Sequence, residues 1–258
     1  MELGGYIGYS CILFGDAVRK AGGKRYFSLE RNPEFGAVIA SLVDLAGLSD
    51  VVKVIVGSSD ASIKRLHTKG TLKRIDMMFL DHYKPAYKTD LKLCEELGLV
   101  GPGSVYAADN VITPGNPPYL EYVRASVAEK RKAAETGDDS GPDARFKDTT
   151  AKQYAKRQGE EKLGSTKGNP NLIYESKLHK SFEPTGEEVC CKSNFVNTTG
   201  HCMSGLLGLD YLARSSGPKQ SVLTHERIPC RHWSTIAIYV SRIISPQCLV
   251  LNNINEQH

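Results

Sequence analysis

Two apolar runs of the sequence end in side chains that could hold a metal ion together. The run 75–80 is followed by Asp81, His82 and Lys84, and the run 104–108 by Asp109 and Asn110. Taken singly, such residues after a strand are more often turns or caps. If the two runs are neighbouring parallel strands, however, their carboxyl ends share one crevice. Asp81, Asp109 and Asn110 then offer three hard oxygens that suit Mg²⁺, with Lys84 close by.

A glycine-rich turn opens the chain. Residues 2–10 read Glu-Leu-Gly-Gly-Tyr-Ile-Gly-Tyr-Ser and lie where a strand is expected to turn into a helix. Glycines there let the backbone turn tightly against a ligand, and the following helix presents free N–H groups. Glu30 ends the next predicted strand, at about the separation of an acid that binds ribose hydroxyls. Because the spacing differs from G-x-G-x-x-G, we predict a nucleoside site other than a conventional dinucleotide site.

Strands and helices alternate from residue 1 to about 125. Apolar runs predict strands at Tyr26–Leu29, Val51–Val56, Ile75–Leu80 and Ser104–Ala108. Helices are predicted at Asn32–Gly47, Ser62–Lys69 and Lys88–Leu97. In the first of these, Asn32 can cap, Pro33 suits the first turn and Gly47 suits the exit. This alternation predicts an α/β fold with right-handed crossovers and a mostly parallel sheet flanked by helices.

Composition limits the remaining classes. A net charge of +4, scattered along the chain, does not favour nucleic acid as a partner. Met1 is followed by Glu2, Leu3 and two glycines, so no signal peptide is predicted. The late apolar stretch 236–251 is broken by Arg242 and Pro246, and is too short to span a bilayer. We therefore expect a cytoplasmic monomer that acts on a small molecule, without nucleic acid or membrane partners.

The seven cysteines raise the question of zinc. Cys11 and Cys94 fall in predicted helices and are expected to be small packing residues. The other five lie in the last quarter of the chain near three histidines; they are Cys190, Cys191, Cys202, Cys230 and Cys248 with His201, His225 and His232. No C-x-x-C pair occurs among them, so the spacing disfavours a zinc site.

The chain divides into four parts by composition. Residues 1–126 form the predicted ligand-binding core, and 127–171 are a charged insertion that would bury little, is partly helical at its start and is expected to be flexible. Residues 172–188 regain apolar character and are predicted to return to the sheet. Residues 189–258 lack clear periodicity, so no element is predicted in this tail.

Several motifs together identify a family resemblance. They are E-L-G-x-Y-x-G-Y-S at 2–10, S-L-E-R-N-P at 28–33, V-G-S-S at 56–59, L-D-H-x-K at 80–84, A-D-N-V at 108–111, P-G-x-P at 114–117 and Y-V-R at 122–124. Residues 2 to about 126 thus resemble the catechol O-methyltransferases, a cation-dependent family that uses S-adenosylmethionine. The resemblance implies a Rossmann-like class I methyltransferase fold, S-adenosylmethionine as methyl donor and Mg²⁺.

The resemblance also implies roles for individual residues. The cofactor-binding residues would be Glu2, Gly4, Tyr6, Tyr9, Ser10, Glu30, Ser59 and His82. Asp81, Asp109 and Asn110 would hold Mg²⁺, and Lys84 would be the general base. Lys84, Asn110 and Pro114 would contact the catechol. Because Mg²⁺ lowers the pKa of a coordinated hydroxyl, a lysine whose own pKa is depressed by the cation and by partial burial could accept the proton.

The sequence departs from the family in three respects. The family's helices before the glycine motif are missing; residues 127–171 are inserted, as in filamentous-fungal relatives; and the tail has no counterpart. An alignment puts His179 where the family has a catechol-binding glutamate, with Glu175 and Glu183 as nearby candidates. We hypothesise that both ends arise from gene-model errors. The alternatives are a related cation-dependent O-methyltransferase acting on a caffeoyl ester or flavonoid, and an inactive binding homologue.

Overall fold

The computed structural model describes residues 1–136, 146, 152–154, 156, 163, 166–180 and 237–244. These residues belong to one compact unit, composed of Met1–Val189 and Thr235–His258. The predicted zinc candidates in the tail lie outside the described residues. Within the described residues, no helix has the length and apolarity needed to cross a membrane.

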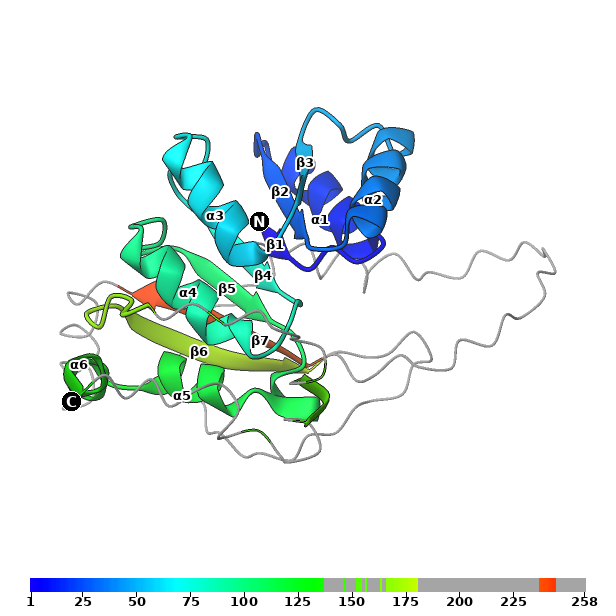
Figure 1. Cartoon of the computed structure of the whole chain (residues 1–258). Helices are drawn as coiled ribbons and strands as arrows, with labels where there is room; N and C mark the ends of the chain where they lie inside the picture. The colour runs from blue at the N-terminus through cyan, green and yellow to red at the C-terminus, as the bar shows by residue number, and fades with distance from the viewer. Residues whose placement is uncertain are drawn as a thin grey trace, which may run out of the picture. The chain divides into compact units, whose positions relative to one another are not determined.

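A seven-stranded sheet forms the centre of this unit, in the order β3-β2-β1-β4-β5-β7-β6 (Figure 1). Its strands are β1 (Glu2–Leu3), β2 (Tyr26–Glu30), β3 (Val52–Val56), β4 (Met77–Leu80), β5 (Val105–Ala108), β6 (Ile173–Lys180) and β7 (Ala237–Ile244). The first five are parallel, and β7 is antiparallel to both of its neighbours. The strand order reverses between β1 and β4, where open α/β sheets bind their ligands.

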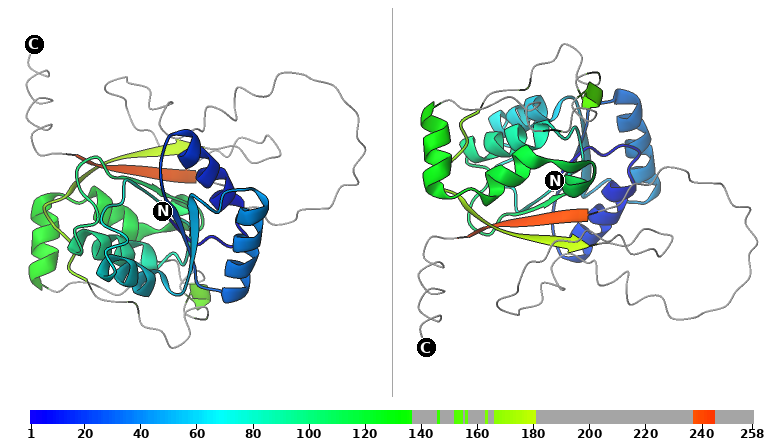
Figure 2. Two further views of the ribbon diagram at one scale, coloured as in Figure 1. Left: turned by 90° about the horizontal axis from the view of Figure 1, so that it is seen from above. Right: turned by 90° about the horizontal axis from the view of Figure 1, so that it is seen from below.

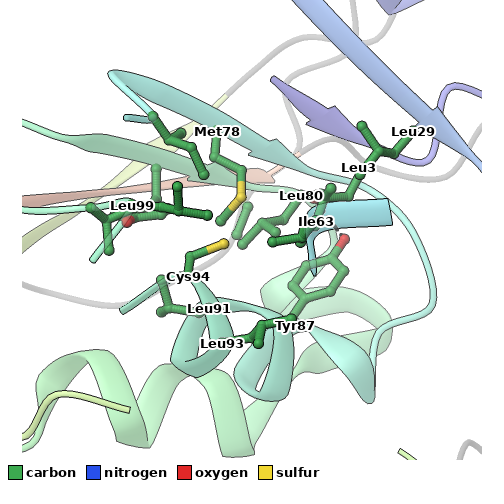
Figure 3. Close-up of a cluster of buried hydrophobic side chains, with 14 of the residues drawn as sticks. Leu3, Leu29, Ile63, Met78, Leu80, Tyr87, Leu91, Leu93, Cys94 and Leu99 are labelled. Carbon is green, nitrogen blue, oxygen red and sulfur yellow. Dashed lines mark hydrogen bonds between the residues drawn. The ribbon is translucent and has the colours of Figure 1, made fainter. Parts of the chain in front are cut away.

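Helices cover both faces of the sheet. They are α1 (Tyr9–Lys20), α2 (Pro33–Leu45), α3 (Ser59–Thr68), α4 (Ala86–Glu96), α5 (Pro117–Arg124) and α6 (Val127–Thr136), and a π-helical turn η1 spans Val111–Gly115. One core cluster joins α1 and α2 to the sheet and includes the buried Cys11. The larger cluster packs α3, α4 and α5 against the other face and includes Cys94 (Figure 3). Both cysteines are therefore packing residues, as predicted.

The predicted core elements are confirmed with small shifts at their ends. Asn32 caps α2 by accepting a hydrogen bond from the Glu34 amide, and Pro33 occupies the first turn. Helix α3 begins three residues before its predicted start because Ser59 already follows an extended Ser58. These shifts do not move any predicted site residue to a different edge of the sheet.

The tail contributes a strand that the sequence did not predict. Strand β7 lies between β5 and β6, so a segment late in the chain occupies an inner position (Figure 2). Its register pairs Val105–Ala108 with Tyr239–Arg242. Strand formation depends strongly on the packing of neighbouring strands, and the sequence around residues 237–244 has no clear periodicity. The local sequence pattern was therefore not enough to predict β7.

A buried carboxylate anchors the end of the insertion. Glu95 on α4 is only 3% exposed and accepts hydrogen bonds from the hydroxyls of Tyr122, at 2.5 Å, and Tyr174, and from the Asn169 amide at 2.8 Å. Burial raises the pKa of Glu95, against the effect of these donors. The Lys130 ammonium lies 4.4 Å from the centre of the Tyr174 ring. This cluster ties α4, α5 and α6 to the return into β6.

Candidate active site

The glycine turn runs directly against the end of β4. Gly4 and Gly8 have positive φ angles of 91° and 92°, and Tyr6 is also left-handed, with φ 48°. A Cβ atom on Gly4 would lie 2.7 Å from the Asp81 carbonyl oxygen. Glycine is needed there both for its backbone conformation and for this close approach. The turn therefore brings the predicted cofactor residues next to the predicted metal and base residues.

Glu2 lies beneath this turn. Its carboxylate is fully buried and accepts hydrogen bonds from Ser28 Oγ at 2.5 Å and from Ser10 Oγ at 2.8 Å. Burial raises the pKa of Glu2, with Ser28 and Ser10 opposing. Both carboxylate oxygens thus have partners inside the protein. Glu2 and Ser10 therefore brace the turn, and the cofactor contact that the resemblance implied for them stays a prediction.

Glu30 holds the turn from the neighbouring strand. Its Oε2 accepts a hydrogen bond from the Tyr6 amide at 2.9 Å, and its Oε1 accepts one from the Asn32 amide at 2.8 Å. A carboxylate has about four lone-pair positions, so acceptor capacity remains for hydroxyl groups. Glu30 is 8% exposed at the carboxyl end of β2, where the sequence predicted a ribose-binding acid.

Two tyrosines of the turn are open to solvent. Tyr6 is 59% exposed and Tyr9 is 73% exposed, while the Tyr6 ring packs edge-on against Phe35. Ser59 begins α3 just after β3 and is half-buried. These three residues follow the carboxyl ends of β1 and β3, so they lie at the same edge of the parallel sheet as Glu30.

Lys84 is held beside Asp81 by two contacts. Its Nζ donates to Asp81 Oδ1 at 2.8 Å and to the Tyr87 hydroxyl at 2.8 Å. Tyr87 is fully buried, and its hydroxyl donates in turn to the Leu80 carbonyl at 2.7 Å. Lys84 itself is 9% exposed, whereas the Asp81 side chain is 39% exposed. The amine is thus fixed in position between an open carboxylate and a buried phenol.

Asp109 and Asn110 lie at the matching position on β5. The register pairs Leu80 with Ala108, so Asp81 and Asp109 follow directly from paired residues. Burial and the nearby Asp81 charge raise the pKa of Asp109 to about 6, against the effect of Lys84. Asn110 has a left-handed backbone, with φ 57°, and its backbone N–H donates a hydrogen bond to Asp109 Oδ1. The two carboxylates therefore repel each other within one site.

This donor set fits a hard divalent cation. Two carboxylates that repel each other, joined by an amide oxygen, provide the ligand chemistry of Mg²⁺, which completes its shell with water or substrate oxygens. In the described part of the chain, this site included, no group of three or more His, Cys, Asp or Glu side chains could hold a metal ion. Asp81 and Asp109 supply two such side chains, and the third predicted ligand is the amide of Asn110. Pro114 lies in the exposed part of η1 that follows them.

Two residues of α4 hold the His82 side chain. Its Nε2 lies 2.8 Å from Asp90 Oδ2, and its ring stacks on Tyr87 at 4.9 Å with an angle of 13°. Its Nδ1 is buried and has no hydrogen-bond partner among the described residues. The position of His82 beside the cofactor stays a prediction.

Sequence reasoning missed three supporting residues. Tyr87 holds Lys84, Asp90 holds His82, and Asn116 Nδ2 donates to the Lys84 carbonyl at 2.7 Å. The positions of Tyr87 and Asp90 on α4, one and two turns after the catalytic motif, were the available signal, because residues at helical spacing share a face.

A comparison with known protein families gives the same assignment. Residues 1–111 match the family described as "Methyltransferase domain". The matched range includes every predicted site residue except Pro114. Together with the mostly parallel sheet covered on both faces, this match confirms the predicted Rossmann-like class I methyltransferase fold.

Two catechol O-methyltransferases support the resemblance drawn from the motifs. The catechol O-methyltransferase of Mus musculus is 42% identical over 126 residues, which are 49% of this chain and 47% of that protein. That of Sus scrofa is 43% identical over 124 residues, covering 48% and 66%. The match to an O-methyltransferase structure from Bacillus cereus covers 95% of this chain and 72% of that protein, with 14% identity and a TM-score of 0.46. The chain spans about half the length of the mouse relative.

The close contact at Gly4 leads to a testable prediction. Gly4→Ala should lower the affinity of the methyltransferase domain for S-adenosylhomocysteine by about tenfold or more, because the new Cβ would displace the Asp81 backbone. Gly22→Ala is the matched control: its φ is also positive, at 76°, but nothing lies within 4 Å of a Cβ there. Left-handed backbone strain should cost both variants about 1–2 kcal/mol, and the contact with the Asp81 backbone should cost Gly4→Ala more.

Calorimetric titration with S-adenosylhomocysteine and urea unfolding of both variants test this prediction. Equal affinity in the two variants would contradict the proposed importance of the contact between the glycine turn and β4. A larger loss of affinity in Gly4→Ala than in Gly22→Ala, measured where urea unfolding shows both variants to be folded, would support it.

Proposed function

We propose that this protein transfers the methyl group of S-adenosylmethionine to one hydroxyl of a catechol, with Mg²⁺ bound at Asp81, Asp109 and Asn110. The observation that carries the proposal is the position of the Lys84 amine. It lies 2.8 Å from the Asp81 carboxylate and is fixed by the buried Tyr87, next to the glycine turn that would hold the methyl donor. The proposed base, the proposed metal ligands and the glycine turn proposed to hold the nucleoside would thus lie at one edge of the sheet.

Each of these residues would have a separate role in the proposed methyl transfer. A bound Mg²⁺ would orient the two catechol oxygens and lower their pKa. Lys84 would accept the proton of the reacting hydroxyl as the oxygen attacks the methyl carbon. The carbon–sulfur bond breaks, and its electron pair remains on sulfur in S-adenosylhomocysteine. Glu30 and the glycine turn would keep the donor in line with the acceptor, and such alignment contributes much of the rate of a two-substrate reaction.

Removal of the metal tests this proposal. The chain should methylate 3,4-dihydroxybenzoate in the presence of Mg²⁺, and excess EDTA should abolish turnover, which readdition of Mg²⁺ should restore. Product would be measured by chromatography with radiolabelled methyl donor. Turnover that persists in EDTA would overturn the metal role of Asp81, Asp109 and Asn110. A complete lack of turnover in both conditions would favour the inactive binding homologue.

The acceptor itself needs a separate measurement. A panel that includes 3,4-dihydroxybenzoate, a caffeoyl ester and a flavonoid would distinguish a catechol enzyme from a relative acting on another vicinal diol. We further propose that the protein acts as a cytoplasmic monomer; size-exclusion chromatography with light scattering and localisation of the tagged protein test these two points.

A further inference from the structure

A chain of three aromatic rings joins the insertion to the β4–α4 turn. Tyr83 lies between His82 and Lys84 in that turn, and its ring meets the Tyr154 ring edge-on at 5.7 Å and 85°. Tyr154 in turn meets Phe146 at 5.2 Å and 78°. The Tyr83 hydroxyl also donates to the Tyr154 carbonyl oxygen at 3.0 Å. The insertion thus contacts the turn that carries the base and a metal ligand.

Burial separates these two aromatic residues from their described neighbours. Phe146 is 6% exposed and Tyr154 is 5% exposed, whereas Lys152, Gln153 and Lys156 are exposed. The composition of this segment did not predict burial at these two positions. Burial of one aromatic side chain removes roughly 150–250 Å² of surface from water. Phe146 and Tyr154 together therefore attach their part of the chain to the turn that contains Tyr83.

We propose that Tyr154 is a positioning residue for the methyl acceptor, and that Tyr154 and Phe146 belong to the support of the site. By tying the Tyr83 ring and hydroxyl, Tyr154 fixes the turn 81–84 and so the orientation of the groups that receive the catechol. The inference rests on the proposed methyl transfer. It predicts a larger effect on the acceptor than on the methyl donor, because Tyr154 holds Tyr83, directly before the proposed base Lys84, whereas the glycine turn is also held by Glu30 from β2.

Variants at Tyr154 separate positioning from simple structural support. Tyr154→Ala should raise the KM for 3,4-dihydroxybenzoate by about tenfold and leave the Kd for S-adenosylhomocysteine within about twofold. Tyr154→Phe keeps the ring and the backbone carbonyl and should rescue the acceptor KM. Gln153→Ala, at an exposed neighbouring position, is the matched control. Equal loss of acceptor and donor affinity in Tyr154→Ala would overturn the proposal.

A second readout does not need turnover. In hydrogen exchange followed by mass spectrometry, Tyr154→Ala should accelerate exchange in peptides covering residues 82–87 and leave the peptide covering residues 5–12 unchanged. Unchanged exchange at 82–87 would overturn the proposal even if activity fell. If the unmodified chain methylates no diol, the proposed function fails, and the exchange result still decides whether the insertion holds this turn.

Discussion

Replacement of Lys84 by methionine is expected to reduce the rate of methyl transfer by about two to four orders of magnitude. Methionine fills similar space but cannot accept the proton of the catechol. It also removes the cation that lies 2.8 Å from the Asp81 carboxylate and interacts with Asp109. Single-turnover measurements with saturating donor and Mg²⁺ would report the chemical step directly, and binding of S-adenosylhomocysteine should stay close to that of the unmodified chain.

Lys84→Arg distinguishes a base from a mere positive charge. Arginine retains the cation beside Asp81 but keeps its proton at any working pH. We expect it to leave the rate as low as in Lys84→Met. A rate within about threefold of the unmodified chain would mean that position 84 contributes only charge, and the reacting proton would have to leave by another route.

Replacement of Glu95 by alanine is expected to lower the free energy of unfolding by roughly 3–5 kcal/mol. The change leaves the hydroxyls of Tyr122 and Tyr174 and the Asn169 amide without their acceptor in a buried place. It also leaves the partly buried Lys130, whose pKa burial lowers to about 8, without the carboxylate that favours its charge. Since native proteins are stable by only about 5–15 kcal/mol, this is a large share.

Glu96→Ala provides the control for this experiment. The residue is next along α4 and also acidic, but it is exposed. Its removal should change the free energy of unfolding by less than about 0.5 kcal/mol. Urea unfolding followed by circular dichroism measures both variants, and equal losses would contradict the structural role assigned to the buried cluster around Glu95.

The sequence predicts the centre of the site well because polar residues there interrupt strong patterns. Asp81 and Asp109 follow apolar strands, and the glycines at 4 and 8 mark a turn, so these residues can be identified from the sequence alone. The residues that hold them in place cannot be identified in this way. Tyr87 lies on the apolar face of α4, so the sequence predicts only a core residue there. The structure shows that its hydroxyl accepts a hydrogen bond from Lys84.

Long-range contacts account for the other differences. Phe146 and Tyr154 are isolated apolar residues in a charged run, and no local periodicity indicates that they pack beside Tyr83. The expected glutamate for the catechol is also not identified by position: Glu175 lies exposed on β6, His179 is half-buried on the same strand, and Glu183 is outside the described residues. Only an arrangement in space, or a measurement, can choose among such residues.

The inner position of β7 has a consequence for synthesis of the protein. Roughly 130 residues separate the end of β5 from the start of β7, so a ribosome that adds about 5–20 residues per second needs on the order of ten seconds to supply the partner. During that interval the β5 edge, next to the future active site, stays unpaired and can associate with other nascent chains. Slower growth at low temperature, or a chaperone that shields strand edges, should therefore raise the yield of folded protein.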